Sequence, residues 1–144
     1  MVIAPDASSN EISIHEALYN RGIDVLVIDH HESNKVSPHA CIINNQLCDY
    51  PTKSLSGAGM VWKFCCYIDK LLDKNVAYDF IDLAALGILG DMMSLRDYET
   101  VEIVRQGFAQ VRNPFFSEMA KMQSYSINKN GGLNPYTVAF YIVP

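Results

Sequence analysis

The chain has 144 residues, of which 49% are hydrophobic and 19% charged, a composition typical of one globular domain rather than a disordered segment. Its formal net charge of -5 argues against a nucleic-acid surface built from this chain alone, although bound cations reverse the local field at a metal site. The four cysteines form no Cys-x-x-Cys pair, which favours reduced thiols over a zinc knuckle or a disulfide framework. No signal peptide is evident and the apolar run 83–89 is too short to span a bilayer, so we expect a cytoplasmic protein without a membrane partner.

The first part of the chain, about residues 1–50, predicts a strand–helix–strand unit. Residues 2–4 and 24–28 are short apolar runs typical of buried strands, and residues 11–21 between them have the apolar spacing of a helix that Gly22 ends. Residues 41–43 are a third strand candidate. This order predicts parallel pairing, and hence an α/β fold with a doubly wound, mainly parallel sheet.

From residue 56 onward the pattern predicts helices. The expected helices cover residues 57–72, 78–93, 98–111 and 115–122. Residues 134–142 could form a helix or a strand, because their β-branched side chains leave the choice open. We therefore expect one domain over residues 1–144, with an α/β part to about residue 50 and a mainly helical part from about residue 56.

The most informative motif is the triplet Asp29-His30-His31, which directly follows the apolar run at residues 25–28. Ligands of open α/β sheets bind outside the carboxyl ends of the strands, so the triplet occupies a position typical of a ligand-binding or active site. Two adjacent histidines point to different sides and can therefore have different roles. One carboxylate and two imidazoles suit divalent ions such as Mn, Zn or Fe, although a lone histidine after a strand is more often structural.

Two further carboxylates are candidate metal ligands, because each stands at the end of a predicted element. Asp6 follows the first strand, and Asp91 follows the apolar run at residues 84–90. Together with His30 they would offer oxygen and nitrogen ligands for an ion that polarises a phosphoryl oxygen. The alternatives are that Asp6 is a turn or helix-capping residue and that Asp91 is a loop residue paired with Arg96.

Other residues admit both a functional and a structural interpretation. Ser56, Gly57 and Gly59 open a predicted helix whose free N–H groups could hold a substrate anion, whereas the glycines alone would allow close helix packing. We expect His15 on the exposed side of its helix and His39 in a loop beside the site. The aromatic side chains of Trp62, Tyr50 and Tyr67 could stack on bases. For Trp62, core packing is the stronger interpretation.

Taken in order, these segments resemble the DHH phosphoesterase superfamily, and within it the branch of RecJ-like single-stranded-DNA exonucleases. The resemblance is carried by four segments between residues 2 and 95: Val-Ile-Ala-Pro-Asp6-Ala-Ser, Val-Leu-Val-Ile-Asp29-His30-His31-Glu-Ser, Tyr50-Pro51-Thr-Lys-Ser-Leu-Ser56-Gly57-Ala58-Gly59-Met-Val-Trp-Lys63-Phe and Leu-Gly-Ile-Leu-Gly-Asp91-Met-Met-Ser-Leu. It implies a DHH-type catalytic domain with a two-metal site, usually for Mn²⁺ or Mg²⁺.

The resemblance also implies a role for each site residue. Asp6 matches a carboxylate that bridges both metals, and His30 and Asp91 match direct metal ligands. His31 matches the histidine nearer the substrate phosphate, and Asp29 matches a residue that orients His30. The implied reaction is hydrolysis of a phosphodiester or phosphoanhydride bond by metal-bound hydroxide, without a covalent intermediate.

Two departures from the family pattern predict an incomplete domain. The acidic Asp-x-Asp strand that precedes the Asp6 segment in the family has no counterpart in residues 1–5, and the smaller C-terminal substrate-binding domain is not seen. We therefore expect a partial domain, incomplete at both ends, which lacks ligands for at least one metal. On its own it should have little activity and weak metal affinity.

The favoured function is 5′-3′ exonuclease activity on single-stranded DNA. Within the same superfamily, the alternatives are a phosphodiesterase for short oligonucleotides or cyclic dinucleotides and an inorganic pyrophosphatase. An alternative of another class is a non-catalytic module that keeps the fold without the full site. The scattered basic residues do not decide among these substrates.

Overall fold

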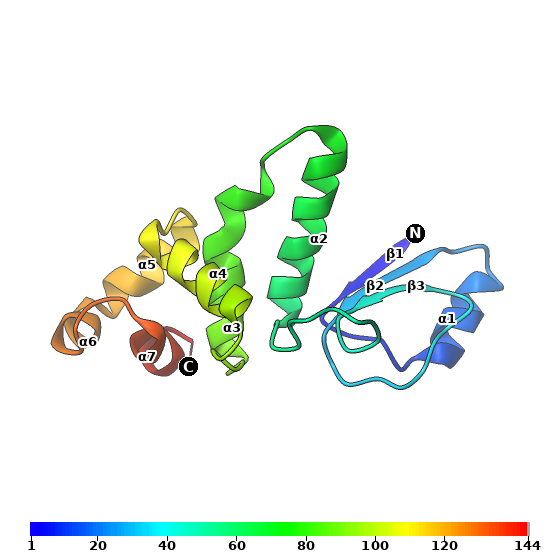
Figure 1. Cartoon of the computed structure of the whole chain (residues 1–144), viewed down its shortest axis with the longest axis horizontal. Coiled ribbons are helices and arrows are strands. Elements are labelled where there is room, and N and C mark those ends of the chain that lie inside the picture. Colours follow the sequence, from blue (N-terminus) through cyan, green and yellow to red (C-terminus); the bar gives the residue numbers. More distant parts are fainter. Residues whose placement is uncertain (144) are drawn as a thin grey trace.

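A small parallel β-sheet forms the N-terminal part of the molecule (Figure 1). The computed structural model describes residues 1–143, and within them the strands β1 (Val2–Pro5), β2 (Val25–Asp29) and β3 (Cys41–Asn44) pair in the order β1-β2-β3. Helix α1 (Ile12–Tyr19) joins β1 to β2, whereas residues 30–40 join β2 to β3 without a helix. Both strand pairs are parallel, which confirms the predicted α/β fold.

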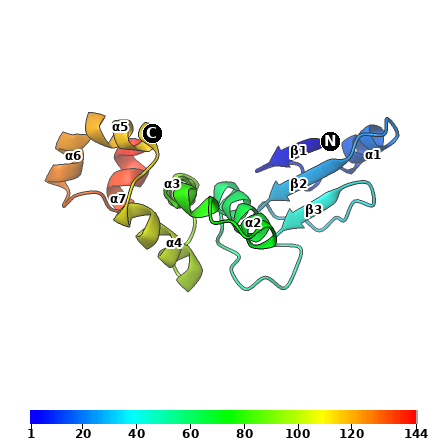
Figure 2. The same cartoon turned by 90° about the horizontal axis from the view of Figure 1, so that it is seen from above.

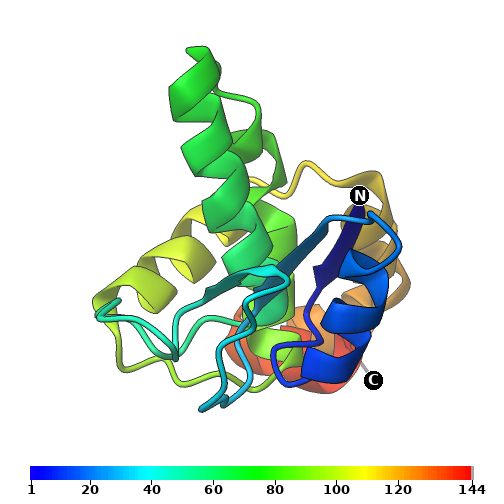
Figure 3. The same ribbon diagram turned by 90° about the vertical axis from the view of Figure 1, so that its right-hand side faces the viewer.

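The central strand, β2, is buried on both of its faces. Leu26 and Ile28 belong to the core that the sheet shares with the helical part, so Val25 and Val27 face the opposite side by the alternation of a strand. Helices α1 and α2 both contact β2, and in Figure 3 they lie on different sides of the strands. Figure 2 shows that the carboxyl ends of the strands are directed towards α2.

The helical part begins with α2 (Gly57–Leu72), which has the predicted bounds. The elements after it are a 3₁₀ turn (Ala77–Phe80), α3 (Ile81–Gly90), α4 (Tyr98–Ala109), α5 (Pro114–Met122), α6 (Ser124–Lys129), α7 (Pro135–Thr137) and a π turn (Val138–Ile142). The helix predicted over residues 78–93 is thus shorter, because a 3₁₀ turn takes its first residues. Residues 134–142 are largely helical, and α6 is an addition to the predicted elements. None of the helices in residues 1–143 has both the length and the apolar composition needed to cross a membrane.

Helices α2 and α3 pack closely because their contact is made by small residues. A Cβ atom at Gly87 would lie 2.5 Å from the Cβ of Ala58, so α3 approaches α2 at this point only because Gly87 has no side chain. Trp62 of α2 is 9% exposed, and its Nε1 donates a hydrogen bond to the carbonyl of Ala77 at 2.9 Å. This confirms the interpretation of Trp62 as a core residue.

A partly buried polar bridge joins α2 to α4. The ammonium of Lys63 lies 2.6 Å from Oε1 of Glu99, and the hydroxyl of Tyr50 donates to the same oxygen at 2.7 Å. Burial alone would raise the pKa of Glu99, but hydrogen bonds from Lys63 and Tyr50 hold it below its ordinary value. Tyr50 thus has its hydroxyl engaged within the protein, whereas Tyr67 is exposed.

The prediction for His15 is wrong. The histidine side chain is only 1% exposed, whereas the apolar side chain of Ile14 on the same helix is 53% exposed. The buried face of α1 runs through Ile12, His15 and Leu18 at a spacing of three residues, because that face packs against the sheet. Both ring nitrogens of His15 lack a hydrogen-bond partner among residues 1–143.

Candidate metal centre

Three of the predicted ligands converge at the carboxyl edge of the sheet. Nε2 of His30 lies 3.1 Å from Oδ1 of Asp6 and 3.1 Å from Oδ2 of Asp91. Asp6 follows β1, His30 follows β2 and Asp91 follows α3, so the cluster joins both parts of the chain. The alternative partner of Asp91, Arg96, forms no ion pair with it within residues 1–143.

The alternation of side chains along β2 explains how the triplet divides. Ile28 faces the core shared with α2 and α3, and Asp29 therefore faces the opposite side of the sheet. His30 returns to the side of Ile28, where the end of α3 lies, and His31 shares the side of Asp29. One strand end thereby supplies a buried histidine, 9% exposed, and another histidine that is 60% exposed.

The Asp6 carboxylate sits against the first turn of α2 because Gly57 leaves room for it. A Cβ atom built on Gly57 would lie 2.1 Å from Oδ1 of Asp6 and 2.5 Å from its Cβ. Asp6 has a left-handed backbone with φ of 59°, which aspartate tolerates better than most residues, and its N–H donates to the carbonyl of Ile28 at 2.8 Å. The sequence therefore needs glycine at position 57 to admit this carboxylate.

Asp91 is held at the C-terminal end of α3 by the helix backbone. Its N–H donates to the carbonyl of Gly87 at 3.0 Å, and Met92 after it adopts a left-handed backbone that turns the chain away. Since Gly87 is also the point at which α3 meets α2, the packing of these helices sets the position of Asp91. Its side chain is 46% exposed and faces His30.

The donor set fits a divalent cation. Nε2 of His30 is buried and forms no hydrogen bond within the described residues, although a carboxylate oxygen of Asp6 and one of Asp91 each lie 3.1 Å from it. Adjacent ligands of one octahedral ion, each roughly 2.1 Å from it, are about 3 Å apart. One ligand atom from each of Asp6, His30 and His31 also lies within 4.8 Å of the others. A mixed set of carboxylate oxygens and imidazole nitrogens suits manganese, and carboxylates suit magnesium.

Asp29 is buried behind this cluster, and its side chain bonds to the ring of His31 as well as to His30, the residue that the resemblance implies it orients. Its carboxylate accepts a hydrogen bond from Nδ1 of His31 at 2.7 Å, whereas its bond to His30 comes from the backbone N–H at 2.8 Å. It also accepts from the N–H of Ser9 at 3.1 Å. The reason is the same alternation: Asp29 and His31, two residues apart, lie on one side of the strand, and His30 lies on the other.

The hydrogen bonds around Asp29 shift the titration of both partners. Burial alone would raise the pKa of Asp29, but the bonds from His31, Ser9 and His30 hold it far below its ordinary value. The bond to Asp29 in turn raises the pKa of His31. Asp29 is therefore ionised, and it fixes the ring of His31 through Nδ1.

The start of α2 is built for packing. The side chain of Ser56 caps the helix by accepting from the N–H of Gly59 at 3.2 Å, and Gly57 and Gly59 are buried. These contacts support the packing interpretation, and a role of Ser56, Gly57 and Gly59 in substrate binding stays a prediction. The prediction that His39 lies beside the site is wrong: it precedes β3, at the amino end of the parallel strands, and its ring lies 4.8 Å from that of Tyr19 at the end of α1.

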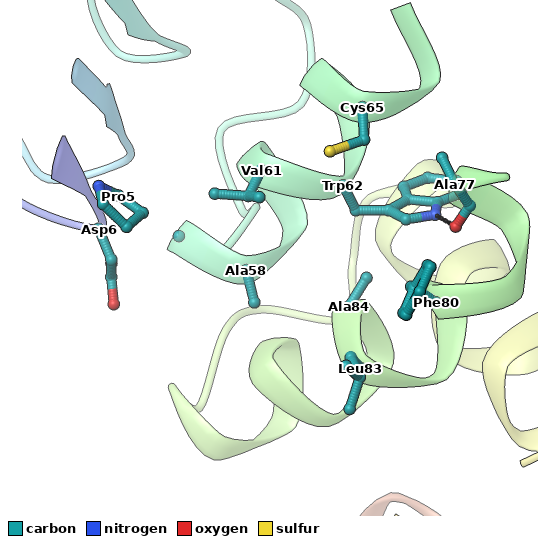
Figure 4. A pocket seen from close by; sticks show the side chains of 11 residues that line it. Pro5, Asp6, Ala58, Val61, Trp62, Cys65, Ala77, Phe80, Leu83 and Ala84 are labelled. Carbon is teal, nitrogen blue, oxygen red and sulfur yellow. Dashed lines mark hydrogen bonds between the residues drawn. The ribbon is translucent and has the colours of Figure 1, made fainter. Parts of the chain in front are cut away.

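An apolar cavity of about 450 Å³ adjoins the cluster on the side of Asp6. Figure 4 shows Pro5 and Asp6 on one side of it, Val61 of α2 in the middle and Phe80 on the far side. Among the described residues that line it, Asp6 alone carries a carboxylate. An apolar surface therefore lies directly beside one of the candidate metal ligands.

Sequence patterns missed two residues near the site. Ser9 and Asn44 are both buried and hydrogen-bonded to each other, with Asn44 also bound to the carbonyl of His31. Ser9 lies in a short polar segment between the first strand and the helix, and Asn44 directly follows a strand candidate; neither belongs to a local motif. Only the register of β3 beside β2, which pairs Asn44 with Asp29, would have placed it here.

A parallel sheet with two carboxylates and a histidine at its carboxyl edge defines an α/β protein with a candidate divalent-metal centre. The model of the DHH family, N-terminal domain, matches residues 1–88, which is more than half of the chain. The chain therefore belongs to the DHH family. Asp6 and the triplet lie within the matched residues, and Asp91 lies just beyond them.

Relatives of known name are similar over most or all of the chain. It is 41% identical over 145 residues to a protein of Bacillus subtilis (strain 168) named "Putative SPbeta prophage-derived single-strand DNA-specific exonuclease YorK", covering 100% of this chain and 25% of the relative. It is 30% identical over 138 residues to the single-stranded-DNA-specific exonuclease RecJ of the same strain, covering 92% and 17%. The chain thus spans a quarter or less of the length of these relatives.

Solved structures show the same fold. The crystal structure of RecJ in complex with Mn²⁺ from Thermus thermophilus matches with a TM-score of 0.81 at 23% identity, covering 99% of this chain and 21% of that chain. A crystal structure of exonuclease RecJ bound to manganese matches with a TM-score of 0.80 at 22% identity, covering 99% and 36%. The predicted fold class is confirmed by both.

Proposed function

We propose that this chain forms the metal-binding catalytic part of a RecJ-like exonuclease that hydrolyses single-stranded DNA with 5′-3′ polarity. The observation that carries the proposal is the convergence of Asp6, His30 and Asp91 at the carboxyl edge of the sheet in a chain of the DHH family. The names of the relatives support single-stranded DNA as substrate, and the manganese in the RecJ structures supports a divalent cation. We propose Mn²⁺ or Mg²⁺ at a two-metal site to which Asp6, His30 and Asp91 contribute some of the ligands.

Each residue of the site has a distinct task in this proposal. Asp6, His30 and Asp91 hold a cation, which when bound would polarise a phosphoryl oxygen and activate water. The ring of His31 lies 4.5 Å from that of His30 and is largely exposed. Because Nδ1–H of His31 donates to Asp29, Nε2 carries a proton only in the imidazolium form, which this bond favours by raising the pKa of His31; in that form Nε2 would donate a hydrogen bond to a phosphate oxygen of the substrate.

The proposal treats the α/β part and the helical part as one functional unit. Asp6 and His30 come from the part before residue 50, and Asp91 comes from the part after residue 56. Since the packing of Gly87 on Ala58 sets the end of α3, a change in that packing would move Asp91 relative to His30. Metal binding therefore depends on both parts of the chain.

The test is hydrolysis of 5′-labelled single-stranded DNA with saturating Mn²⁺, at protein concentrations high enough to measure the low activity expected of this chain, compared with its His30→Ala and Asp91→Asn variants. We expect kcat/KM to fall by about 100-fold or more in each variant, because a bound ion supplies several kcal/mol of transition-state stabilisation. Chromatography of the products shows the polarity. Full activity of both variants would overturn the assignment of the site.

Parallel substrates separate the alternatives. Faster turnover of dinucleotides, cyclic dinucleotides or pyrophosphate than of single-stranded DNA would replace the proposed substrate and keep the metal centre. Mn²⁺ binding without hydrolysis of any of these phosphate esters or anhydrides would favour a non-catalytic module of the same fold.

A further inference from the structure

A buried chain of polar side chains lies behind His31 and joins three segments of the protein. Ser9 comes from the loop after β1, Asp29 ends β2 and Asn44 ends β3. Their exposed fractions are 2%, 2% and 4%. Buried polar side chains of this kind are costly unless each is hydrogen-bonded, so their partners show what they hold in place.

Asn44 is the residue that connects this chain of side chains to the backbone of His31. Its Nδ2 donates to Oγ of Ser9 at 2.8 Å and to the carbonyl of His31 at 2.9 Å. Its Oδ1 accepts from the N–H of Gln46 at 2.8 Å, so both ends of the amide are engaged. Ser9 continues the chain, because its N–H donates to Oδ2 of Asp29 at 3.1 Å.

The hydrogen bond from Asn44 to the His31 carbonyl takes the place of a strand-pairing hydrogen bond, because the sheet ends before His31. The pairing of β2 with β3 ends at Asp29 and Asn44, and the following residues, 30–40, have no strand partner within the described part of the chain. Asn44 therefore fixes the backbone of His31 through a hydrogen bond to its carbonyl, while Asp29 fixes the ring through a hydrogen bond to Nδ1. Ser9 ties these two supports to each other.

We propose that Asn44 is a positioning residue for His31: through the His31 carbonyl and Ser9 it fixes the ring for contact with the substrate phosphate. This assignment rests on the proposed function only for the role of His31 in catalysis. The structural half, that Asn44 sets the ring of His31, stands on these hydrogen bonds and is tested without substrate. Asn44 itself touches neither substrate nor metal in this account.

The neighbouring residue Asn45 provides a matched control. It is also an asparagine, 1% exposed, but its Nδ2 donates to the carbonyl of Thr52 at 3.0 Å, within its own loop. Asn44→Ala and Asn45→Ala therefore remove the same group from similarly buried positions. Ser9→Ala is a second, milder variant, which removes the hydroxyl that accepts from Asn44 and keeps the backbone bond to Asp29.

Two measurements test the proposal. The first is the ¹⁵N and ¹H NMR signal of the hydrogen-bonded His31 Nδ1–H group, without metal or substrate. We expect it to shift or broaden in Asn44→Ala and Ser9→Ala and to stay at its wild-type position in Asn45→Ala. The second is steady-state hydrolysis of single-stranded DNA, in which kcat should fall by about 10- to 100-fold in Asn44→Ala, with the Mn²⁺ Kd and KM unchanged.

The outcomes are distinguishable. An unchanged His31 signal in both Ser9→Ala and Asn44→Ala, or equal changes in the Asn44 and Asn45 variants, would overturn the proposal. If Asn44→Ala does not fold, Ser9→Ala carries the same comparison. Absence of even the low DNA hydrolysis expected of this chain would refute the proposed function, whereas the NMR comparison would still decide whether Asn44 positions His31.

Discussion

The close contact between Gly57 and Asp6 makes Gly57→Ala the sharpest perturbation of the site. The new methyl group would lie 2.1 Å from Oδ1, 2.3 Å from Cγ and 2.5 Å from Cβ of Asp6, distances that real Cβ contacts do not show. The Asp6 side chain would have to withdraw by about 1 Å, and a misplacement of that size costs roughly 100-fold in a catalytic site. Alanine otherwise favours a helix over glycine by about 0.5–1 kcal/mol, so the fold should survive.

Isothermal titration calorimetry with Mn²⁺ measures the consequence. We expect the Mn²⁺ Kd of Gly57→Ala to rise by about 10-fold or more, with a melting temperature close to that of the wild type. The matched control is Gly59→Ala, in the same helical turn, where the new methyl group would meet Leu55 at an ordinary 3.4 Å. Wild-type Mn²⁺ affinity in Gly57→Ala, or an equal loss in Gly59→Ala, would refute the reasoning.

Three further predictions follow from other features of the structure. His15→Leu should raise the free energy of unfolding in urea by about 1–2 kcal/mol, because the wild-type ring is buried with both nitrogens unpartnered among residues 1–143; a destabilised variant would mean that the ring has a partner. Glu99→Gln should lower that free energy by about 1–3 kcal/mol at pH 7, since it weakens the bonds to Lys63 and Tyr50. Folding lowers the pKa of Glu99, so ionised Glu99 adds to the free energy of unfolding above its unfolded pKa of 4.5, and this contribution is lost as the pH falls through the folded pKa. A difference in stability between the wild type and Glu99→Gln that grows on acidification would contradict this. Saturating Mn²⁺, at about 100 times its Kd, should stabilise the wild type by about 2.7 kcal/mol and leave His30→Ala unchanged in a thermal melt, whereas equal stabilisation of both would place the ion elsewhere.

Strand-end position was enough to find the residues that converge. Asp6, His30 and Asp91 each follow a predicted strand or helix, and the carboxyl ends of parallel strands share one edge of the sheet. The alternation of side chains along a strand, which places His30 and His31 on opposite sides, also places Asp29 and His31 on the same side. The family resemblance implied a role toward His30, and in the structure Asp29 bonds to the ring of His31 and to the backbone N–H of His30.

Other features depend on contacts between segments far apart in the chain. His15 is buried because the sheet selects a face of α1 that its hydrophobic pattern does not show. Asn44 reaches His31 only through the register of β3 beside β2, and Gly57 meets Asp6 only after α2 packs against the strand ends. Tertiary contacts of this kind have no local sequence signal, so they could not be predicted from patterns along the chain.

The central claim is that Asp6, His30 and Asp91 bind one divalent ion between them. A crystal of the protein soaked with Mn²⁺ and measured at the manganese absorption edge tests it most directly, because anomalous scattering locates the ion independently of any assay. We predict an anomalous peak within about 2.3 Å of His30 Nε2 and of an oxygen of each carboxylate. A manganese peak elsewhere, with His30 Nε2 still 3.1 Å from both carboxylates and no ion between them, would contradict the account.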